Sequence, residues 1–557
     1  MNNSLTIYGP SVGKGLGKNV FGKDVANHSL FRALLLYGGL EQIDFLTANT
    51  ASADAIRASL IDDTSVETKV TSNHLLAIQP AKKSGAMLRG SAEIASLIWD
   101  RRRNNATSDY SLIGLIHTLA PPAIREDISK LITAPTMPWD ALVCTSPAVR
   151  TAVETMFGDW HDYYKARFGG TKNPSLNLPL IPLGVEAKDF SPTPETPNKR
   201  ASLRQELNVG EEDMLVLWVG RLSFYEKAFP QPMMLAIEAA AKLSGKITHF
   251  AMAGWFPGGQ ADEQLYREAA AICAPNVQFH IIDGNNKPKL SEAWAAADVF
   301  ISLVDNIQET FGITPIEAMA SGLPVVVSDW DGYRYTVRDG QDGFLIPTLL
   351  GEPSPITENL IAQHNHGLKT YQQYVAITAQ HTAVSVSMAA ARLAELFGSK
   401  ELRQRLGAAG QQRIFDTFDW RVVAPQYVAL AKEMGQIRRT AVANMSGMLS
   451  RGHHPARSDP FHAFANFPTA TLTDTTILSI DPDYDPVNLD HLMSSKLVSY
   501  ANSWRLDMPN TKKMIEILVI TGPMPLSELM QKVLANDHQS AKLALLWLAK
   551  IGVINWA

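Results

Sequence analysis

The sequence predicts an α/β protein with two doubly wound, parallel-sheet domains, followed by a smaller and mostly helical unit. Short apolar runs, many of them β-branched, alternate with longer stretches of helical periodicity. This alternation predicts parallel sheets covered by helices on both faces. The runs fall into two sets, separated by the proline-dense residues 178–197, whose restricted backbone suits a connector. A chain of 557 residues is also long enough for several domains.

These patterns define four segments. Residues 1–185 form the first Rossmann-like domain, and residues 186–435 form the second, with trailing helices. Residues 436–475 are a linker rich in His, Pro, Ser and Thr, and residues 476–557 form the last unit. Ligands bind beyond the carboxyl ends of such sheets, so we expect a central cleft between the two domains. We expect strands at 4–8, 43–46, 111–117, 141–145, 215–219, 248–253, 277–281, 299–303, 324–328 and 343–346, and trailing helices at 389–396, 402–418 and 424–438.

The last unit resembles a winged helix. Helical patterns at residues 489–504, 512–521, 526–534 and 540–550 precede a terminal strand. The expected recognition helix, 540–550, offers only Lys542 and Lys550 as cations, which makes a poor phosphate-binding face. We therefore favour docking to a protein partner, or self-association, over DNA binding.

Composition excludes several classes of protein. A net charge of −5 over this length gives no general attraction to nucleic acid or acidic lipid. Cys144 and Cys273 are too few and too far apart for a disulfide framework, which fits a reducing compartment. The start of the chain does not read as a signal peptide, and no apolar run approaches the roughly 18 residues of a spanning helix. We expect a cytoplasmic protein. The basic runs at 82–83 and 101–103 leave open a peripheral contact with the inner face of the membrane, although a solvated helix face is the simpler interpretation.

The segment from Glu309 to Glu317 carries the strongest chemical signal. It reads Glu-Thr-Phe-Gly-Ile-Thr-Pro-Ile-Glu and follows the expected strand 299–303. If a helix begins near Ile313, its free N–H groups can bind a phosphate, and Gly312, after Phe311, lets the backbone approach closely. Glu309 can then accept hydrogen bonds from sugar hydroxyls, and Glu317 from a ribose diol.

With this element the chain resembles glycosyltransferase family 4, whose members have the GT-B fold of two Rossmann domains. Arg221 and Lys227 lie in a Gly-Arg-Leu…Lys element that is similar to the family's, and the resemblance implies that they grip the donor diphosphate. Ala228 replaces the usual glycine, and Leu183 stands where the family's interdomain element commonly has asparagine. The resemblance covers residues 4–427, roughly three quarters of the chain.

The first domain supplies two further matches. The glycine-rich residues 13–17, with Gly15 and Gly17, follow the first strand and correspond to the family's loop that faces the donor diphosphate or the acceptor; on their own they indicate only a tight turn. His117 ends an expected strand and corresponds to the family's strand-end histidine. A histidine at the end of a strand is usually structural. The resemblance implies that His117 instead points into the cleft and has a catalytic or sugar-binding role.

The resemblance implies a retaining, metal-independent hexosyltransferase without a resident cofactor. A nucleotide-sugar donor would pass its sugar to a hydroxyl acceptor, a glycan or a lipid-linked molecule, in a setting such as cell-surface polysaccharide synthesis. The implied catalytic residues are His117, Arg221, Lys227 and Glu309, and the implied donor-binding residues are Gly15, Gly17, Phe311, Gly312, Ile313 and Glu317.

Two other classes of function stay open at this point. A phosphorylase or a nucleotide-sugar epimerase can share the two-Rossmann architecture, although the ordered match of Arg221, Lys227, Glu309 and Glu317 favours a transferase. The chain could also be a scaffold whose winged helix recruits protein or DNA, and the intact glutamates and cations argue against that.

Overall fold

The computed structural model describes residues 3–12, 22–48, 51–61, 66–170, 172–442, 452–533 and 537–557. They divide into two compact units, residues 1–454 and 455–557. The first unit contains two six-stranded sheets, and all strand pairs described in them are parallel.

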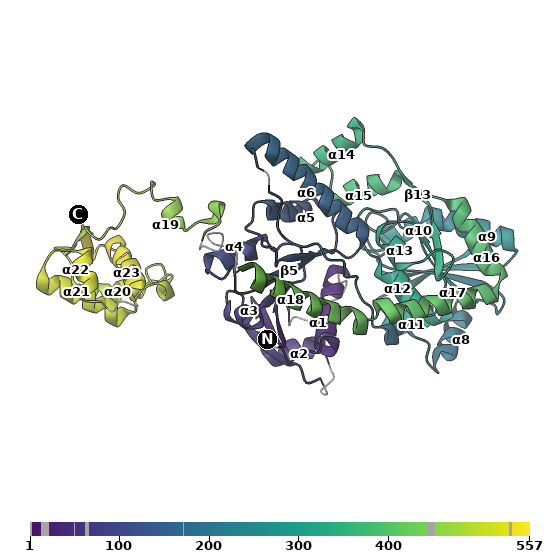
Figure 1. Ribbon diagram of the computed structural model, residues 1–557, viewed down its shortest axis with the longest axis horizontal. Coiled ribbons are helices and arrows are strands. Elements are labelled where there is room, and N and C mark those ends of the chain that lie inside the picture. The colour runs from purple at the N-terminus through teal and green to yellow at the C-terminus, as the bar shows by residue number, and fades with distance from the viewer. Residues whose placement is uncertain are drawn as a thin grey trace. The chain divides into compact units, whose positions relative to one another are not determined.

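The first sheet has the strand order β3-β2-β1-β4-β5-β6. Its central strands are apolar and buried on both faces, as parallel strands between two helical layers must be. Its elements, drawn in purple and blue in Figure 1, are β1 (Ser4–Tyr8), α1 (Gly22–Tyr37), β2 (Gln42–Thr47), α2 (Ala53–Leu60), β3 (Lys69–His74), α3 (Gln79–Ser84), β4 (Ala86–Arg89), α4 (Ala95–Arg103), β5 (Ser111–Leu115), α5 (Pro122–Ser129), β6 (Ala141–Val143) and α6 (Pro147–Phe168).

The second sheet repeats this topology, with the order β12-β11-β10-β7-β8-β9. Two hydrophobic clusters, one on each face, contain most of its strand residues. The elements are α7 (Ala187–Phe190), α8 (Thr196–Glu206), β7 (Met214–Val219), α9 (Gln231–Ser244), β8 (Thr248–Gly254), α10 (Gln260–Cys273), β9 (Gln278–Asp283), α11 (Lys287–Ala296), β10 (Val299–Ser302), α12 (Ile313–Ala320), β11 (Val325–Ser328), α13 (Asp331–Thr336), β12 (Gly343–Ile346), α16 (Val386–Gly398), α17 (Lys400–Arg413) and α18 (Trp420–Val442). The predicted pair of doubly wound domains is confirmed.

An antiparallel pair and two helices interrupt the second domain between β12 and α16. The inserted segment consists of β13 (Thr348–Leu350), α14 (Pro355–Asn365), α15 (Tyr371–Gln380) and β14 (Thr382–Val384). This segment was not predicted from the sequence. We call this segment the inserted hairpin.

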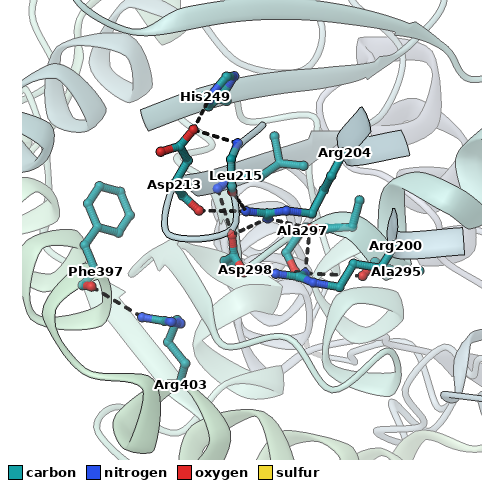
Figure 2. Close-up of polar contacts among 12 residues, drawn as sticks. Arg200, Arg204, Asp213, Leu215, His249, Ala295, Ala297, Asp298, Phe397 and Arg403 are labelled. Carbon is teal, nitrogen blue, oxygen red and sulfur yellow. Dashed lines mark hydrogen bonds and ion pairs between the residues drawn. The ribbon is translucent and has the colours of Figure 1, made fainter. Parts of the chain in front are cut away.

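A polar network fixes the amino ends of β7 and β10. Figure 2 shows Arg200 and Arg204 of α8 converging on Asp298, at 2.6 and 3.0 Å from its two oxygens. The N–H group of Leu215 donates to the same carboxylate at 2.8 Å. This cluster lies at the opposite end of the strands from the carboxyl edge, so it supports the sheet and does not face the site.

Helix α18 returns to the first domain although it follows the second in sequence. Its buried residues, including Trp420, Tyr427 and Met434, belong to the same hydrophobic cluster as the strands of the first sheet, and it packs against α1 (Figure 1). Next to it, the Val185 N–H donates to Phe418 O at 2.9 Å and the Trp420 N–H donates to Val185 O at 3.0 Å. The two chain segments that join the domains therefore run side by side.

Within the basic run 101–103, Arg103 is exposed, but Arg101 does not lie on a solvated face because its side chain is fully buried. Both of its terminal nitrogens bind the carboxylate of Asp140, at 2.6 and 2.7 Å, and one also donates to Tyr110 O at 2.8 Å. The interpretation of Arg101 as part of a surface patch is wrong, since this bidentate pair satisfies the charge in the interior. Lys82, from the other basic run, pairs with Asp109 at 2.8 Å.

The second unit contains a three-stranded antiparallel sheet in the order β16-β15-β17, packed with helices around one hydrophobic cluster. Its elements are α19 (Pro460–Ala463), β15 (Ile477–Ile480), α20 (Pro486–Met493), α21 (Met508–Thr521), β16 (Met524–Pro525), α22 (Leu526–Gln531), α23 (His538–Lys550) and β17 (Ile554–Trp556). The apolar residues of α23 are largely core residues, which explains its low charge. The winged helix itself stays a prediction.

The expected helix at 489–504 is wrong beyond Met493. Ser494 Oγ donates to His491 O at 2.7 Å, and the Leu497 N–H donates to Ser495 Oγ at 3.3 Å. These serine side chains replace backbone hydrogen bonds of a continuing helix, which ends it.

Among the described residues, no helix is both long and apolar enough to cross a membrane.

Candidate functional site

Most of the predicted residues follow strands next to the points where the strand order of each sheet reverses. In the second sheet the reversal lies between β7 and β10, and Arg221 and Glu309 follow these two strands. In the first sheet it lies between β1 and β4, where Gly90 follows β4 and His117 follows the adjacent β5. Ligands of open α/β sheets bind outside the carboxyl ends of the strands at such reversals.

Two glycines lock the loop after Glu309 against helix α13. Gly312 has φ of 84°, and a Cβ there would lie 1.9 Å from the ring of Tyr333. A Cβ on Gly332 would lie 2.2 Å from the Cα of Phe311. Only glycine fits at both positions. Helix α12 then begins at Ile313 without a side-chain cap, so its first N–H groups are available to an anion.

Both predicted cations lie in ion pairs. Lys227 Nζ lies 3.2 Å from Glu309 Oε2, and the Lys227 and Glu309 side chains are 35% and 16% exposed. An Arg221 nitrogen lies 2.6 Å from Glu226 Oε2, in a less accessible position. The carboxylate predicted to bind sugar hydroxyls, Glu309, therefore pairs with Lys227, one of the two cations predicted to bind the diphosphate. A phosphate would have to compete with these carboxylates for the two cations.

Glu317 lies in helix α12 and lines a cavity of about 730 Å³ between the two domains. The cavity walls include residues of α1 and α11, together with Ile313. Burial raises the pKa of the Glu317 carboxyl to about 7, and no ion pair with it is seen within the described part of the chain. Because desolvation disfavours the charged form, this carboxyl is poised between its two states near neutral pH.

His117 is held by the first domain. Its Nε2 lies 2.9 Å from Asn27 Oδ1 and 3.2 Å from Gly90 O. Two acceptors around one nitrogen assign the hydrogen to Nε2 and leave Nδ1 as an acceptor. Burial lowers the pKa of His117 to about 4, so the ring is neutral at pH 7. It can accept a hydrogen bond from a hydroxyl, but it does not contribute a charge.

Hydrogen bonds connect the two domains beside this site. Thr310 Oγ1 donates to His117 O at 2.7 Å, and Thr118 Oγ1 donates to Gln308 O at 3.2 Å. Further along, Ser146 Oγ donates to Asp331 Oδ1 at 2.7 Å. Burial, with a smaller contribution from the charge of Glu309, raises the pKa of Asp331 to about 7. The residues on either side of Glu309 are thus attached to the first domain.

The structure brings His117, Glu309 and Lys227 into one hydrogen-bonded neighbourhood, with Arg221 on the adjoining loop. Glu317 faces the cavity described above, whose lining includes Ile313 but not Arg221, Lys227 or Glu309. The predicted Gly15 and Gly17 lie outside the described residues.

Sequence reasoning missed Asn27, Glu226, Gln308 and Asp331. Asp331 follows the buried strand β11, so the rule that applied to His117 could have singled it out. Glu226 is adjacent to Lys227, and a carboxylate between two cations is a visible signal. Asn27 and Gln308 gave no such signal, because their partners lie far away in sequence.

Residues 199–350 match the family model described as glycosyl transferases group 1. Two curated relatives are each similar to about a third of the chain. The D-inositol 3-phosphate glycosyltransferase of Geodermatophilus obscurus is 31% identical over 178 residues, which is 30% of this chain and 36% of the relative. The phosphatidyl-myo-inositol mannosyltransferase of Mycobacterium leprae is 31% identical over 170 residues, 30% of this chain and 34% of the relative. The match thus spans about a third of the length of these relatives.

Solved structures with low sequence identity were also found. HepE of Anabaena, solved in complex with UDP and glucose, has a TM-score of 0.46 and 15% identity, covering 78% of this chain and 100% of that one. A glycosyltransferase from Rickettsia africae has a TM-score of 0.45 and 12% identity, covering 78% and 98%.

The match at residues 199–350 includes Arg221, Lys227, Glu309 and Glu317, the positions on which the resemblance to glycosyltransferase family 4 was stated. Two parallel six-stranded sheets of the same strand order agree with the GT-B architecture that this resemblance implies. The resemblance is confirmed by the match of residues 199–350 to the model of group 1 glycosyl transferases.

Proposed function

We propose that this protein is a retaining glycosyltransferase that moves a hexose from a nucleotide-sugar donor to a hydroxyl acceptor. One observation carries the proposal. Two cations, Arg221 and Lys227, share the reversal point of the second sheet with Glu309 and the uncapped start of helix α12. A helix N-terminus and two cations suit a diphosphate, and an adjacent carboxylate suits the hydroxyls of a sugar.

The donor can be oriented from the same contacts. Its diphosphate occupies the start of α12 and displaces the carboxylates from Arg221 and Lys227. Its nucleoside extends toward Glu317, which lines the 730 Å³ cavity and accepts hydrogen bonds from the ribose diol as a carboxylate. Glu309 then binds sugar hydroxyls, and the acceptor nitrogen of His117 receives another hydroxyl from the wall formed by the first domain.

The reaction breaks the bond between the anomeric carbon and the donor phosphate oxygen. The acceptor oxygen forms its bond to that carbon on the same face, and its proton passes to the departing phosphate oxygen. Arg221 and Lys227 neutralise the negative charge that develops on the diphosphate. Because these two side chains supply positive charge at the leaving group, we expect transfer to survive treatment with EDTA.

The acceptor is the less constrained partner. We propose a glycan or lipid-linked hydroxyl used in cell-surface polysaccharide synthesis, with the protein in the cytoplasm or at the inner face of the membrane. The names of the two curated relatives, an inositol-phosphate glycosyltransferase and a phosphatidyl-myo-inositol mannosyltransferase, are compatible with a polar or lipid-linked acceptor. For residues 476–557 we propose docking to a protein or self-association.

Arg221→Ala tests the assignment of the diphosphate site. Loss of a cation that stabilises the leaving group should lower turnover about 100- to 1000-fold, measured as release of nucleoside diphosphate. Arg267→Ala is the matched control, because Arg267 is 48% exposed on α10 and pairs with its helix neighbour Glu263. Wild-type turnover in Arg221→Ala would contradict the assignment.

An NMR spectrum of the first product formed distinguishes retention from inversion at the anomeric carbon.

A further inference from the structure

Gln308, the neighbour of Glu309, is hydrogen-bonded on every side. Its N–H donates to Asn306 Oδ1 at 3.0 Å, and its carbonyl accepts from Thr118 of the first domain at 3.2 Å. Its side-chain Nε2 donates to Glu226 O at 3.3 Å, and its Oε1 accepts from the Tyr371 hydroxyl at 2.8 Å. One residue therefore connects the Glu309 loop with the Arg221 loop, the first domain and the inserted hairpin.

The inserted hairpin presents Tyr371 at a fixed place. Tyr371 is the first residue of α15, whose start is fixed by a reciprocal capping box between Thr370 and Gln373. Helices α14 and α15, both labelled in Figure 1, are joined by the rings of His364 and Tyr374, stacked at 5.4 Å with an interplanar angle of 11°. Burial raises the pKa of the Tyr371 hydroxyl, so this group stays a hydrogen-bond donor at all physiological pH values.

A second contact from the hairpin reaches the arginine loop. Gln372 Nε2 donates to Glu226 Oε1 at 3.3 Å, and the other oxygen of Glu226 holds Arg221 at 2.6 Å. Two neighbouring residues of the hairpin, Tyr371 and Gln372, thus contact the two loops whose residues are proposed to bind the diphosphate and the sugar. The matched family segment ends at residue 350, before α14 and α15 begin.

We infer that Tyr371 is a positioning residue that acts through Gln308, so that the inserted hairpin holds the Glu309 and Arg221 loops in their donor-binding arrangement. This inference rests on the proposed function. Tyr371 contacts neither predicted cation in these hydrogen bonds, and its influence passes through the side-chain amide of Gln308 and the backbone on either side of it. Without the hydrogen bond from Tyr371 to Gln308, the Glu309 and Arg221 loops lose a contact that holds both of them to the inserted hairpin.

Four proteins test the inference: the wild type, Tyr371→Phe, Gln308→Leu and the double variant. Tyr374→Phe is the matched control, because Tyr374 lies one turn further along α15 and stacks on His364 within the hairpin. Hydrogen–deuterium exchange is measured over residues 221–229 and 304–312. Binding of UDP, GDP and ADP is measured by isothermal titration, and thermal unfolding reports global stability.

One neutral hydrogen bond corresponds to about 2- to 10-fold in an equilibrium. We expect Tyr371→Phe to weaken binding of the preferred diphosphate by that factor and to speed exchange in both loops, with the melting temperature close to that of Tyr374→Phe. Because Tyr371 acts through Gln308, the double variant should be no weaker than Gln308→Leu alone. The inference is overturned if Tyr371→Phe behaves like Tyr374→Phe in both readouts, or if the two substitutions add independently.

The exchange measurement separates this inference from the proposed function. If the wild type binds none of the three diphosphates, the donor assignment loses its support, while loop exchange still reports whether Tyr371 positions the two loops. Faster exchange in Tyr371→Phe alone would then retain the positioning role. Unchanged exchange, with diphosphate binding intact in the wild type and the variant, would remove that role and leave the proposed function in place.

Discussion

Replacing Glu317 by glutamine should make the protein more stable at high pH than at low pH, relative to the wild type. The pKa of Glu317 is about 7 in the folded chain against an ordinary value of 4.5. A raised pKa means that the folded state holds the proton more tightly. The favourable contribution of this proton is therefore fully present below pH 4.5 and is lost as the pH rises through 7.

The size of the effect follows from the same two values. At 1.36 kcal/mol per pH unit, the difference between 4.5 and about 7 gives on the order of 2 to 3 kcal/mol lost from the wild type by pH 8. Burial also raises the pKa of Asp331 to about 7 and of Asp305 to about 8, so the wild type alone would show a composite. Only the difference between the wild type and Glu317→Gln isolates this one carboxyl.

Urea unfolding of both proteins from pH 5 to pH 8.5 measures that difference. We expect the free energy of unfolding of Glu317→Gln to gain about 2 kcal/mol or more on the wild type between pH 5 and pH 8. Glu352→Gln, at an exposed position of the same domain, should show no such trend. A wild-type-to-variant difference that stays constant with pH would refute the argument that burial controls Glu317.

Three further predictions concern binding and folding. The affinity of the wild type for its preferred nucleoside diphosphate should fall several-fold from pH 8 to pH 6, because the Glu317 carboxyl loses its charge when it is protonated. In titration calorimetry, Glu317→Gln should bind the diphosphate more weakly than the wild type at pH 8 and with little dependence on pH. Glu309→Gln releases Lys227 from its ion pair, so the diphosphate should bind about 2- to 5-fold more tightly. Turnover of the donor should fall, because the carboxylate proposed to bind the sugar is lost. Equal or weaker binding of the diphosphate would show that the ion pair does not compete with phosphate. Asp140→Ala leaves the guanidinium of Arg101 buried and unpaired, which should lower the free energy of unfolding by about 3 to 5 kcal/mol; a loss below about 1 kcal/mol in urea unfolding would contradict the account of this pair.

The sequence predicted the fold where burial leaves a regular pattern. Strands β1 and β12 were predicted with the bounds that the structure gives, because their apolar runs are bounded by turn residues. Strand β3 was missed because it lies at the edge of the first sheet with the polar sequence Lys-Val-Thr-Ser-Asn-His, none of it fully buried. The four-residue strand β4 was also missed. Missing these two strands did not change the predicted architecture, because the alternation of the other strands and helices already indicated two doubly wound domains.

Residues of the candidate site could be predicted from the sequence only where a local motif contains them. The segment from Glu309 to Glu317 can be recognised because a loop and one helix carry all of it. The bonds that hold this segment connect residues far apart in the chain, such as Thr118 with Gln308 and Ser146 with Asp331. No local pattern records such pairs. The pairing of Arg221 with Glu226 also depends on loop geometry, so the sequence indicated the cations but not their partners.

The proposed function requires that Arg221, Lys227 and Glu309 together activate a nucleotide sugar. A panel of common nucleotide sugars, incubated singly with the purified protein and analysed by mass spectrometry for released nucleoside diphosphate, tests it most directly. We expect a restricted set of donors to be hydrolysed slowly in the absence of an acceptor, with the nucleoside diphosphate and the free sugar in equal amounts. No release from any donor of the panel would rule out the proposed function.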